Sequence, residues 1–378
     1  MMIRCLAALI FVASSAAPAW TDEFEQRAGA LLIEESIPGA AWAIVDAQGR
    51  IEVGTFGHVD RARTRPVDER TVFRLASVSK GFAAAAATLA VSEQRLGWDW
   101  PVAELVPAFP IAEPVITVAD LLGQSTGYIP HAFDNLIEAG YDLNQIVPRF
   151  AGLEPLCSPG RCYTYQNGLF SLIEPALEAA GLPPYPQFVQ QRLFVPLAMQ
   201  DASLGYEAFR QADNRALPHV RRLGNWRTVD VSPNYYRVGA AAGVNASATD
   251  MGRWLNAMLG RHPEVLDTHA IAAMTEPRVR TRRDLNRRHW RELLTDAHYG
   301  LGWRIYDLGG ERVVYHGGWV AGYRAEVSFS PDRGVGLAIL VNAESAVVAE
   351  ISTSFWKMMT EPRRMAHDGG SEPSATAP

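Results

Sequence analysis

The chain has 378 residues, of which 48% are hydrophobic and 20% are charged. This is the composition of a folded globular protein, and it excludes both an intrinsically disordered chain and a small disulfide-stapled domain. The net charge of -6 at pH 7 excludes general electrostatic attraction to nucleic acid or to an anionic membrane. Only two of the 35 Lys and Arg residues are lysines, Lys80 and Lys357.

Residues 1–19 have the pattern of a secretory signal peptide. Arg4 precedes an apolar run over residues 6–12, and small residues follow up to Ala19. A membrane anchor is the alternative, but the apolar run is far shorter than the about 20 residues that cross a bilayer. We therefore expect cleavage near Ala19, a periplasmic or secreted protein, and no membrane span in the mature chain.

Periodicity predicts helices and antiparallel strands at both ends of the mature chain. The front elements are a helix that begins at an N-cap Thr21, a β-hairpin and an alanine-rich helix. They cover residues 21–36, 40–45 with 51–56, and 77–94. The back elements are one helix, four strands and a final apolar helix. They cover residues 247–259, then 300–306, 313–316, 323–329 and 335–341, then 346–359.

The middle of the chain is rich in proline and in short helical patterns, among them a capping box at Thr117 and Asp120. The element order predicts an α+β fold, with one antiparallel sheet built from both chain ends and flanked by N- and C-terminal helices. We expect an α/β lobe, a second and mostly helical lobe, and a disordered tail. These comprise residues 20–92 with 246–360, residues 93–245, and residues 361–378.

Two cysteines, Cys157 and Cys162, remain after the predicted cleavage. They flank Pro159 and Gly160, whose tight turn can bring the two thiols together. In an oxidising compartment this spacing predicts a local disulfide. We expect no metal site here, because no second cysteine pair matches the first.

A Ser-x-x-Lys motif lies at the start of the alanine-rich helix. On a helix, Ser77 and Lys80 lie on one face about one turn apart. The amine can then take the proton of the attacking hydroxyl, provided that burial or a nearby cation lowers its pKa. Arginine could not do this, because it stays protonated. The alternative is coincidence, since either lysine can follow a serine at this spacing by chance.

Two other serines fit catalytic patterns. Ser354 and Lys357 have the same spacing, but they lie inside the terminal helix and not at a helix start, where free N–H groups are available. Ser125 lies in a Gly-x-Ser-x-Gly pattern, which requires a preceding strand, whereas the preceding residues predict a helix. We expect neither serine to be the nucleophile.

Two later segments, together with Ser77 and Lys80, carry a resemblance to a known family. They are Tyr165-Gln166-Asn167 and His316-Gly317-Gly318-Trp319. Over about residues 21–359, the chain resembles serine hydrolases related to class C β-lactamases, low-molecular-weight penicillin-binding proteins and D-aminopeptidases. The resemblance implies a β-lactamase/transpeptidase-like fold and an acyl-enzyme mechanism that needs no metal or organic cofactor.

The resemblance also implies a role for each matching residue. Ser77 matches the acylated nucleophile, Lys80 its proton acceptor, and Tyr165 a tyrosine that shares proton transfer. Asn167 matches a residue that orients substrate and lysine. The substrate-flanking strand carries the other matches, His316, Gly317, Gly318 and Trp319. The oxyanion hole would be the backbone N–H groups of Ser77 and Trp319. Ordinary structural roles remain the alternative for the tyrosine, the asparagine and the histidine.

His316 departs from the Lys-Thr-Gly triplet that is usual in β-lactamases of this type. A histidine with an ordinary pKa of about 6.5 is charged roughly a quarter of the time at pH 7, so it should capture a substrate carboxylate less well than lysine. Similar histidine triplets occur in D-aminopeptidases and in relatives that act on peptides or esters. We expect a small-molecule or peptide substrate of the D-amino-acid peptide, β-lactam or small-ester class.

Two alternatives stay open, a carboxylesterase without peptidase activity and a catalytically silent envelope-binding module that kept the fold. The arginine-rich run over residues 278–291 is the one strong basic patch. We interpret it first as a solvated linker before the C-terminal strands. It could instead rim the cleft or contact an anionic polymer. The oligomeric state stays open.

Overall fold

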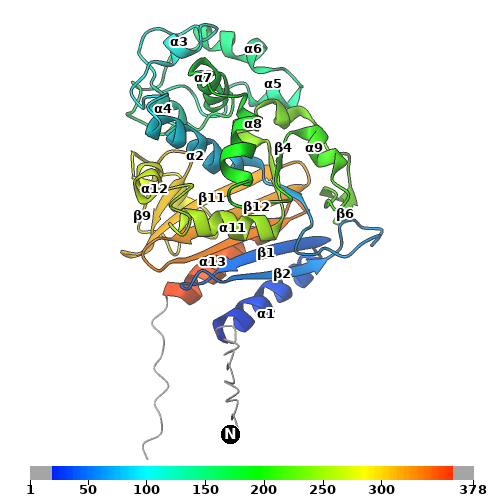
Figure 1. The fold of residues 1–378 in the computed structure, drawn as a ribbon. Coiled ribbons are helices and arrows are strands. Elements are labelled where there is room, and N and C mark those ends of the chain that lie inside the picture. Colours follow the sequence, from blue (N-terminus) through cyan, green and yellow to red (C-terminus); the bar gives the residue numbers. More distant parts are fainter. Residues whose placement is uncertain (1–18, 361–378) are drawn as a thin grey trace, which may run out of the picture.

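The computed structural model describes residues 19–360. The predicted tail and, apart from Ala19, the predicted signal peptide lie outside the described residues. An antiparallel eight-stranded sheet in the order β2-β1-β13-β12-β11-β10-β9-β8 runs through the molecule (Figure 1). Its strands are β1 (Gly39–Val45), β2 (Ile51–Gly57), β8 (Val279–Arg280), β9 (Asp296–Tyr299), β10 (Arg304–Asp307), β11 (Arg312–Val320), β12 (Tyr323–Ser330) and β13 (Val335–Val341).

Strands from the two chain ends meet inside this sheet, as predicted. β1 pairs with β2 in the expected hairpin and with β13 on its other side. The predicted strand over residues 300–306 is wrong at its start, because β10 begins only at Arg304. The preceding residues form a tight turn from β9, in which Gly300 N–H donates to the Trp303 carbonyl at 2.8 Å. Gly302 adopts a φ of 72° in this turn, a backbone conformation that favours glycine.

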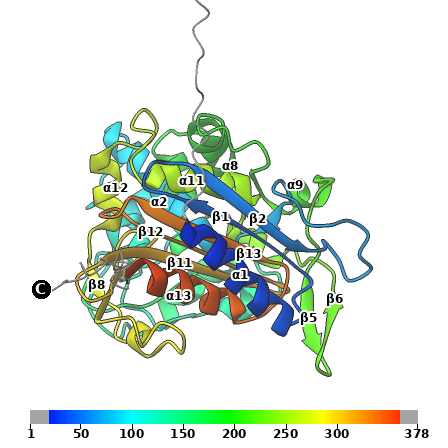
Figure 2. The same cartoon turned by 90° about the horizontal axis from the view of Figure 1, so that it is seen from below.

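Two terminal helices, α1 (Ala19–Glu34) and α13 (Val347–Thr360), cover one face of the sheet side by side (Figure 2). α1 buries Phe24 against the ring of Phe355, with ring centroids 5.6 Å apart. The prediction that Thr21 caps this helix is wrong. α1 already begins at Ala19, so Thr21 lies inside its first turn, where it is buried.

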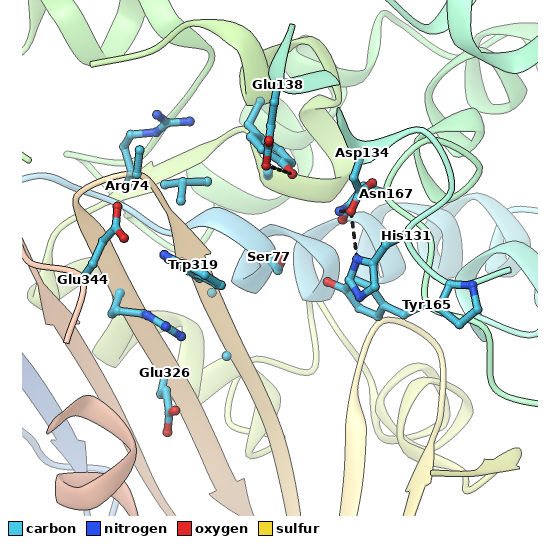
Figure 3. Close-up of a pocket in the computed structure, with 18 of the residues that line it drawn as sticks. Arg74, Ser77, His131, Asp134, Glu138, Tyr165, Asn167, Trp319, Glu326 and Glu344 are labelled. Carbon is cyan, nitrogen blue, oxygen red and sulfur yellow. Dashed lines mark hydrogen bonds and ion pairs between the residues drawn. The ribbon is translucent and has the colours of Figure 1, made fainter. Parts of the chain in front are cut away.

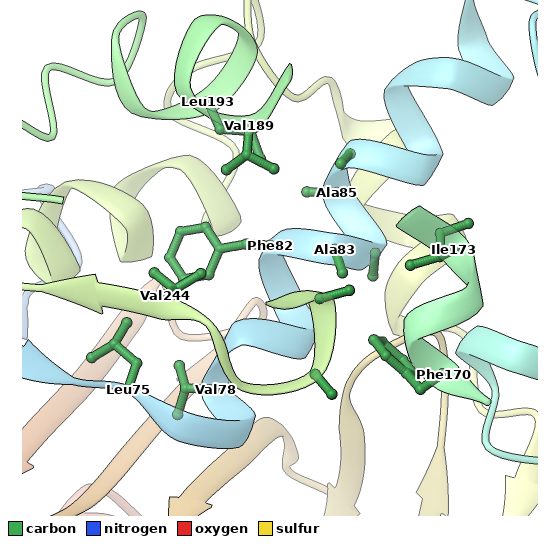
Figure 4. Close-up of a cluster of buried hydrophobic side chains, with 14 of the residues drawn as sticks. Leu75, Val78, Phe82, Ala83, Ala85, Phe170, Ile173, Val189, Leu193 and Val244 are labelled. Atoms are coloured by element: carbon green, nitrogen blue, oxygen red, sulfur yellow. The ribbon is translucent and has the colours of Figure 1, made fainter. Parts of the chain in front are cut away.

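The opposite face of the sheet packs against α11 (Ala248–Met258), which contacts β1, β2 and β13. α2 (Ser79–Ser92) and α12 (Thr268–Thr275) pack against each other. α2 is enclosed on all sides, and its alanines let neighbouring elements approach closely (Figure 4). Phe82 of α2 stacks on Trp254 of α11 with ring centroids 4.1 Å apart. The central position of α2 fixes the residues at its N-terminal end within a rigid core.

Short helices and strands fill the middle of the chain above this face (Figure 1). The helices are α3 (Val102–Leu105), α4 (Val118–Leu122), α5 (Asp134–Glu138), α6 (Leu143–Ile146), α7 (Ile173–Ala179), α8 (Tyr185–Val189), α9 (Tyr206–Gln211) and α10 (Gly239–Ala242). The remaining short helical segments, of which η1 and η6 lie outside the middle of the chain, are η1 (Ala76–Val78), η2 (Val147–Gly152), η3 (Phe170–Leu172), η4 (Gln190–Phe194), η5 (Asn234–Arg237) and η6 (Asp284–Asn286). The small strands, which the sequence patterns did not predict, are β3 (Phe73–Arg74), β4 (Ser203–Leu204), β5 (His219–Arg222), β6 (Asn225–Thr228) and β7 (Val244–Ala246).

Local sequence signals agree with several of these elements. The predicted capping box at Thr117 and Asp120 starts α4, and Ser247 caps α11 in the same way. Cys157 and Cys162 form the expected disulfide. The division into two lobes stays a prediction, since one hydrophobic cluster runs from the sheet into the middle helices. Within residues 19–360, no helix has the length and apolar character needed to cross a membrane.

Candidate active site

A cleft of about 880 Å³ opens where η1 meets β11 and the middle helices (Figure 3). Most of the predicted site residues line it: Ser77, Tyr165, Asn167, Gly317, Gly318 and Trp319. Lys80 and His316 are fully buried behind its wall. The structure therefore gathers the predicted side chains, from elements far apart in the chain, around one cavity.

The turn that carries Ser77 is held tightly against β11. Ala76 has a φ of 49°, in the left-handed region that non-glycine residues rarely adopt. A Cβ atom on Gly318 would lie 2.1 Å from the Leu75 carbonyl oxygen and 3.1 Å from Ser77 N. Only glycine permits this approach, which sets the Ser77 N–H beside the strand that carries Trp319.

Lys80 is positioned by three partners. Its Nζ lies 2.8 Å from Asn167 Oδ1, 3.1 Å from the Ala241 carbonyl oxygen and 3.4 Å from Ser77 Oγ. Burial lowers the pKa of Lys80 well below its usual value of 10.5; the carboxylate of Asp134 opposes this shift, and the guanidinium of Arg304 adds to it.

A neutral amine fits these three partners. It has two N–H donors and one lone pair, and Asn167 and Ala241 each offer an acceptor. Its lone pair is then left to face Ser77 Oγ. The arrangement can therefore accept a proton from the serine hydroxyl.

Tyr165 completes the group around the serine. Its hydroxyl hydrogen-bonds to Ser77, and its ring centroid lies 4.7 Å from Lys80 Nζ. Burial raises the pKa of Tyr165 to about 12, although Arg304 and the bond to Ser77 oppose that shift. Tyr165 is thus a neutral O–H donor at neutral pH, and Lys80 is the group suited to act as base.

Asn167 is oriented by a carboxylate that the sequence patterns did not single out. Its Nδ2 donates to Asp134 Oδ2 at 2.9 Å, so its Oδ1 faces Lys80. The same oxygen of Asp134 lies 2.8 Å from His131 Nδ1 at the cleft edge. No motif marks this pair, because both residues come from the loop at the start of α5.

His316 corrects one expectation from the sequence. Its Nε2 lies 3.1 Å from the Tyr299 hydroxyl and 3.4 Å from Arg304 Nη1. Burial lowers the pKa of His316 well below 6.5, and the charges of Arg304 and Lys80 add to the shift. The expected partial positive charge at pH 7 is wrong, because burial and the neighbouring guanidinium of Arg304 keep the imidazole neutral.

Arg304 supplies a permanent positive charge beside His316. It lines the cleft and donates to Asp284 Oδ2 at 3.1 Å and to the Tyr163 hydroxyl at 3.2 Å. Its side chain is 14% exposed. Sequence patterns alone could not single it out, because arginine is the common basic residue of this chain.

The arginine-rich run is only partly the solvated linker that we expected. Arg280 lies in β8 and pairs with Asp296 at 2.8 Å. Arg283 and Arg287 line the cleft, and Arg287 donates to the Tyr306 hydroxyl at 3.0 Å. This run folds back toward the wall on which Arg304 lies.

The two other serines that fit catalytic patterns, Ser125 and Ser354, lie outside the main cleft. Ser125 follows α4, so a helix and not a strand precedes it. Its hydroxyl donates to Asp120 Oδ1 at 3.1 Å. Ser354 is buried inside α13, and neither it nor Lys357 lines the main cleft. Among the described residues, no group of three or more His, Cys, Asp or Glu side chains is arranged to hold a metal ion.

Comparison with known proteins points to one family. A family model described as Beta-lactamase matches residues 21–353. The chain is 25% identical to the Unguisins hydrolase ungD of Aspergillus violaceofuscus over 85% of this chain, and it spans 61% of that protein's length. It is 25% identical to a Beta-lactamase of Escherichia coli over 94% of this chain and 98% of the relative.

A D-aminopeptidase of Cereibacter sphaeroides is also 25% identical, over 84% of this chain and 59% of the relative. Among solved structures, the octameric penicillin-binding protein homologue from Pyrococcus abyssi superposes with a TM-score of 0.79. That match has 22% sequence identity and covers 90% of this chain and 77% of the other. It confirms the predicted β-lactamase/transpeptidase-like α+β fold.

Proposed function

Because the chain belongs to the beta-lactamase family, whose members are serine hydrolases, we propose that it hydrolyses amide or ester bonds through an acyl-enzyme at Ser77. The observation that carries this proposal is the position of the Lys80 amine. It is fully buried, 3.4 Å from Ser77 Oγ, with two acceptors for its N–H groups. That is the state in which an amine acts as a general base.

Acylation follows from this geometry. Lys80 takes the Ser77 proton while Oγ forms a bond to the substrate carbonyl carbon, and the carbonyl oxygen becomes an oxyanion. The backbone N–H groups of Ser77 and Trp319 would stabilise that charge. Tyr165 donates its proton to the leaving amine or alcohol as the scissile bond breaks, and protonated Lys80 returns a proton to Tyr165.

Deacylation repeats these steps with water as the nucleophile. Water gives a proton to Lys80, the base, as its oxygen attacks the acyl carbon. The bond to Ser77 Oγ breaks, and the serine recovers a proton. No step requires a group from outside the chain other than water and substrate.

The arginines that line the cleft indicate which class of substrate it favours. With His316 neutral, Arg304 offers the positive charge that can meet a substrate carboxylate, and Arg283 and Arg287 lie on the same side. The cleft is also larger than a small ester requires. We therefore place carboxylate-bearing peptides of D-amino acids and β-lactams ahead of small neutral esters as substrates.

Export belongs to the same proposal. The pattern of residues 1–19 predicts a signal peptide, and the disulfide between Cys157 and Cys162 supports an oxidising compartment. Fractionation of cells that produce the full chain, with the N-terminal sequence of the mature protein, tests it. Retention of residue 1 in a cytoplasmic fraction would contradict it.

Active-site labelling tests the hydrolase. Wild type and Ser77→Ala are incubated with a fluorophosphonate and with labelled penicillin, and peptide masses locate the label. We expect label on the Ser77 peptide of the wild type and none on the variant. Label on Ser125, or equal behaviour of both proteins, contradicts the mechanism.

A parallel screen with p-nitrophenyl esters, D-alanyl amides and nitrocefin separates the substrate classes. Ester turnover alone would favour the carboxylesterase alternative. The absence of all turnover and label would favour the silent envelope-binding module.

A further inference from the structure

The two acceptors that hold the Lys80 amine come from two separate chain segments. Asn167 lies in the segment that carries Tyr165 and leads into η3, whereas Ala241 lies in α10. A small displacement of either segment would turn the lone pair of Lys80 away from Ser77. The position of the amine therefore depends on how these segments are fastened to each other.

A carboxylate from α7 fastens the start of α10. The first N–H groups of a helix have no partner inside the helix, and here the Ala240 N–H donates to Glu174 Oε1 at 2.7 Å. The Gly239 N–H also hydrogen-bonds to Glu174. A Cβ on Gly239 would lie 3.3 Å from Glu174 Oε2, so the carboxylate lies directly against this turn.

Glu174 belongs to the chain segment that carries the other acceptor. It follows Asn167 and η3, where the ring of Phe170 lies 5.2 Å from Lys80 Nζ. One side chain thus joins the Asn167 segment to the Ala241 segment.

The far end of the α10 segment is fastened separately. The Val244 N–H donates to Ser79 Oγ at 2.9 Å, and the Val244 carbonyl accepts from the Leu75 N–H at 3.0 Å. These bonds hold the end of the segment next to α2. Glu174 is therefore the side chain that hydrogen-bonds to the beginning of α10, while α2 and η1 pack against the same short helix.

The surroundings of Glu174 contain little that would replace its role. The charged group that acts on it is Glu178, on its own helix, and Tyr185 of α8 faces it with a hydroxyl that has no hydrogen-bond partner among the described residues. α10 offers only backbone N–H groups. Burial raises the pKa of Glu174 to about 7, against the opposing effect of the bond from Ala240. The mechanism above does not use this carboxylate as a proton carrier.

We propose that Glu174 is a positioning residue for catalysis, which keeps the Ala241 carbonyl in place and thereby aims the Lys80 amine at Ser77. The inference rests on the proposed function, because without acyl transfer Glu174 would only cap a short helix. Its expected signature is a loss in kcat, since a displaced base slows chemistry more than it weakens substrate binding.

Four variants test the role with p-nitrophenyl acetate as the probe. Glu174→Ala removes the acceptor, and Glu174→Gln keeps an oxygen that can accept from Ala240. Leu177→Ala is the control for stability, because it removes a buried side chain of the same helix. Glu178→Ala is the control for charge on that helix. Circular dichroism establishes that each variant is folded at the assay temperature.

We expect Glu174→Ala to lower kcat about 10- to 100-fold with KM within about threefold, the size of effect that a displacement of about 1 Å produces. Glu174→Gln should recover activity to within about fivefold of wild type, because one hydrogen bond to α10 is restored. Both controls should keep the wild-type kcat. Glu174→Gln thus distinguishes the loss of the hydrogen bond to α10 from a general loss of folded structure.

Two outcomes overturn the inference: a folded Glu174→Ala variant with the wild-type kcat, or a Leu177→Ala variant that loses as much kcat as Glu174→Ala. Ser77→Ala is assayed alongside. If Ser77→Ala is inactive while Glu174→Ala matches wild type, only this inference fails. If Ser77→Ala matches wild type, the proposed hydrolase itself fails.

Discussion

The chain contains the Ser-x-x-Lys spacing twice, and the two copies lie in opposite surroundings. Lys80 is fully enclosed at the start of a central helix, with Ser77 on the wall of the cleft. Lys357 lies in the last turn of α13 with its side chain 40% exposed, 3.3 Å from the carboxylate of Glu292. Its motif partner Ser354 is buried inside the same helix.

The comparison teaches that the spacing alone does not make a catalytic pair. At the first copy, burial removes the water that would stabilise a charged amine, and Arg304 adds to the shift. At the second copy, solvent and a carboxylate surround the amine, and the pocket that Ser354 and Lys357 line holds only about 150 Å³. The following predictions test that contrast, beginning with the largest expected effect.

Matched substitutions at the two motifs should give opposite results. Ser77→Ala and Lys80→Met should each lower kcat/KM by about 10⁴-fold or more, as loss of a nucleophile or its base does in serine hydrolases. Ser354→Ala and Lys357→Met should stay within about twofold of wild type, as surface and non-site changes do. The assay is ester hydrolysis by folded protein. An equal loss of kcat/KM in Ser354→Ala would contradict the assignment of Ser77 as the only nucleophile of the two.

A methyl group at Gly318 should disturb the first motif by displacing the backbone of its turn, with neither the Ser77 nor the Lys80 side chain changed. Gly318→Ala places a Cβ against the Leu75 carbonyl, so β11 must move away from η1. We expect kcat to fall about 10²-fold through loss of the oxyanion geometry. The matched change is Gly29→Ala in α1, where a Cβ meets no atom within 4 Å. It should keep kcat and stabilise the fold by about 0.5–1 kcal/mol. A fully active Gly318→Ala enzyme would argue against the oxyanion hole.

The charges around Lys80 should move the pH profile in opposite directions. kcat/KM rises with pH through the pKa of Lys80, because only the neutral amine accepts a proton. The Arg304 charge lowers that pKa, so Arg304→Met should move the acidic limb to higher pH. The Asp134 charge raises it, so Asp134→Asn should move the limb to lower pH. Each shift should be roughly one pH unit. Profiles with a neutral ester check this, and shifts of the same sign would contradict the assignment of Lys80 as base.

The smallest effect is expected at the surface ion pair of the second motif. Lys357 and Glu292 lie 3.3 Å apart with side chains 40% and 64% exposed. Glu292→Gln should change the free energy of unfolding by less than about 1 kcal/mol, because solvent and salt screen such pairs. Urea denaturation measures it. A loss well above that value would mean that the end of α13 is held by its charges and not by its apolar face.

Much of the fold could be predicted from neighbouring residues. The hairpin of β1 and β2 and the caps of α4 and α11 follow from patterns a few residues long. The Ser77 and Lys80 pair is also local, and with the later motifs it indicated the family. The strand predicted over residues 300–306 was too long, because glycines in a turn resemble the ends of strands in sequence.

The surroundings of the site could not be predicted in this way. Asn167 lies 87 positions from Lys80 in the chain and binds its amine, and the family resemblance supplied that pairing where periodicity could not. Nothing in the sequence marked Asp134 or Arg304, and the neutral state of His316 was missed. These properties depend on burial and on charges brought together by packing.

The sequence by itself determined that two serine–lysine pairs have helical spacing and that one of them accompanies the later family motifs, because spacing and short motifs are local properties of the chain. Only the tertiary structure decided which lysine is enclosed, what its amine faces, and which arginines line the cleft. The physical reason is that the proton affinity of a side chain depends on exclusion of water and on nearby charges, and distant segments supply both.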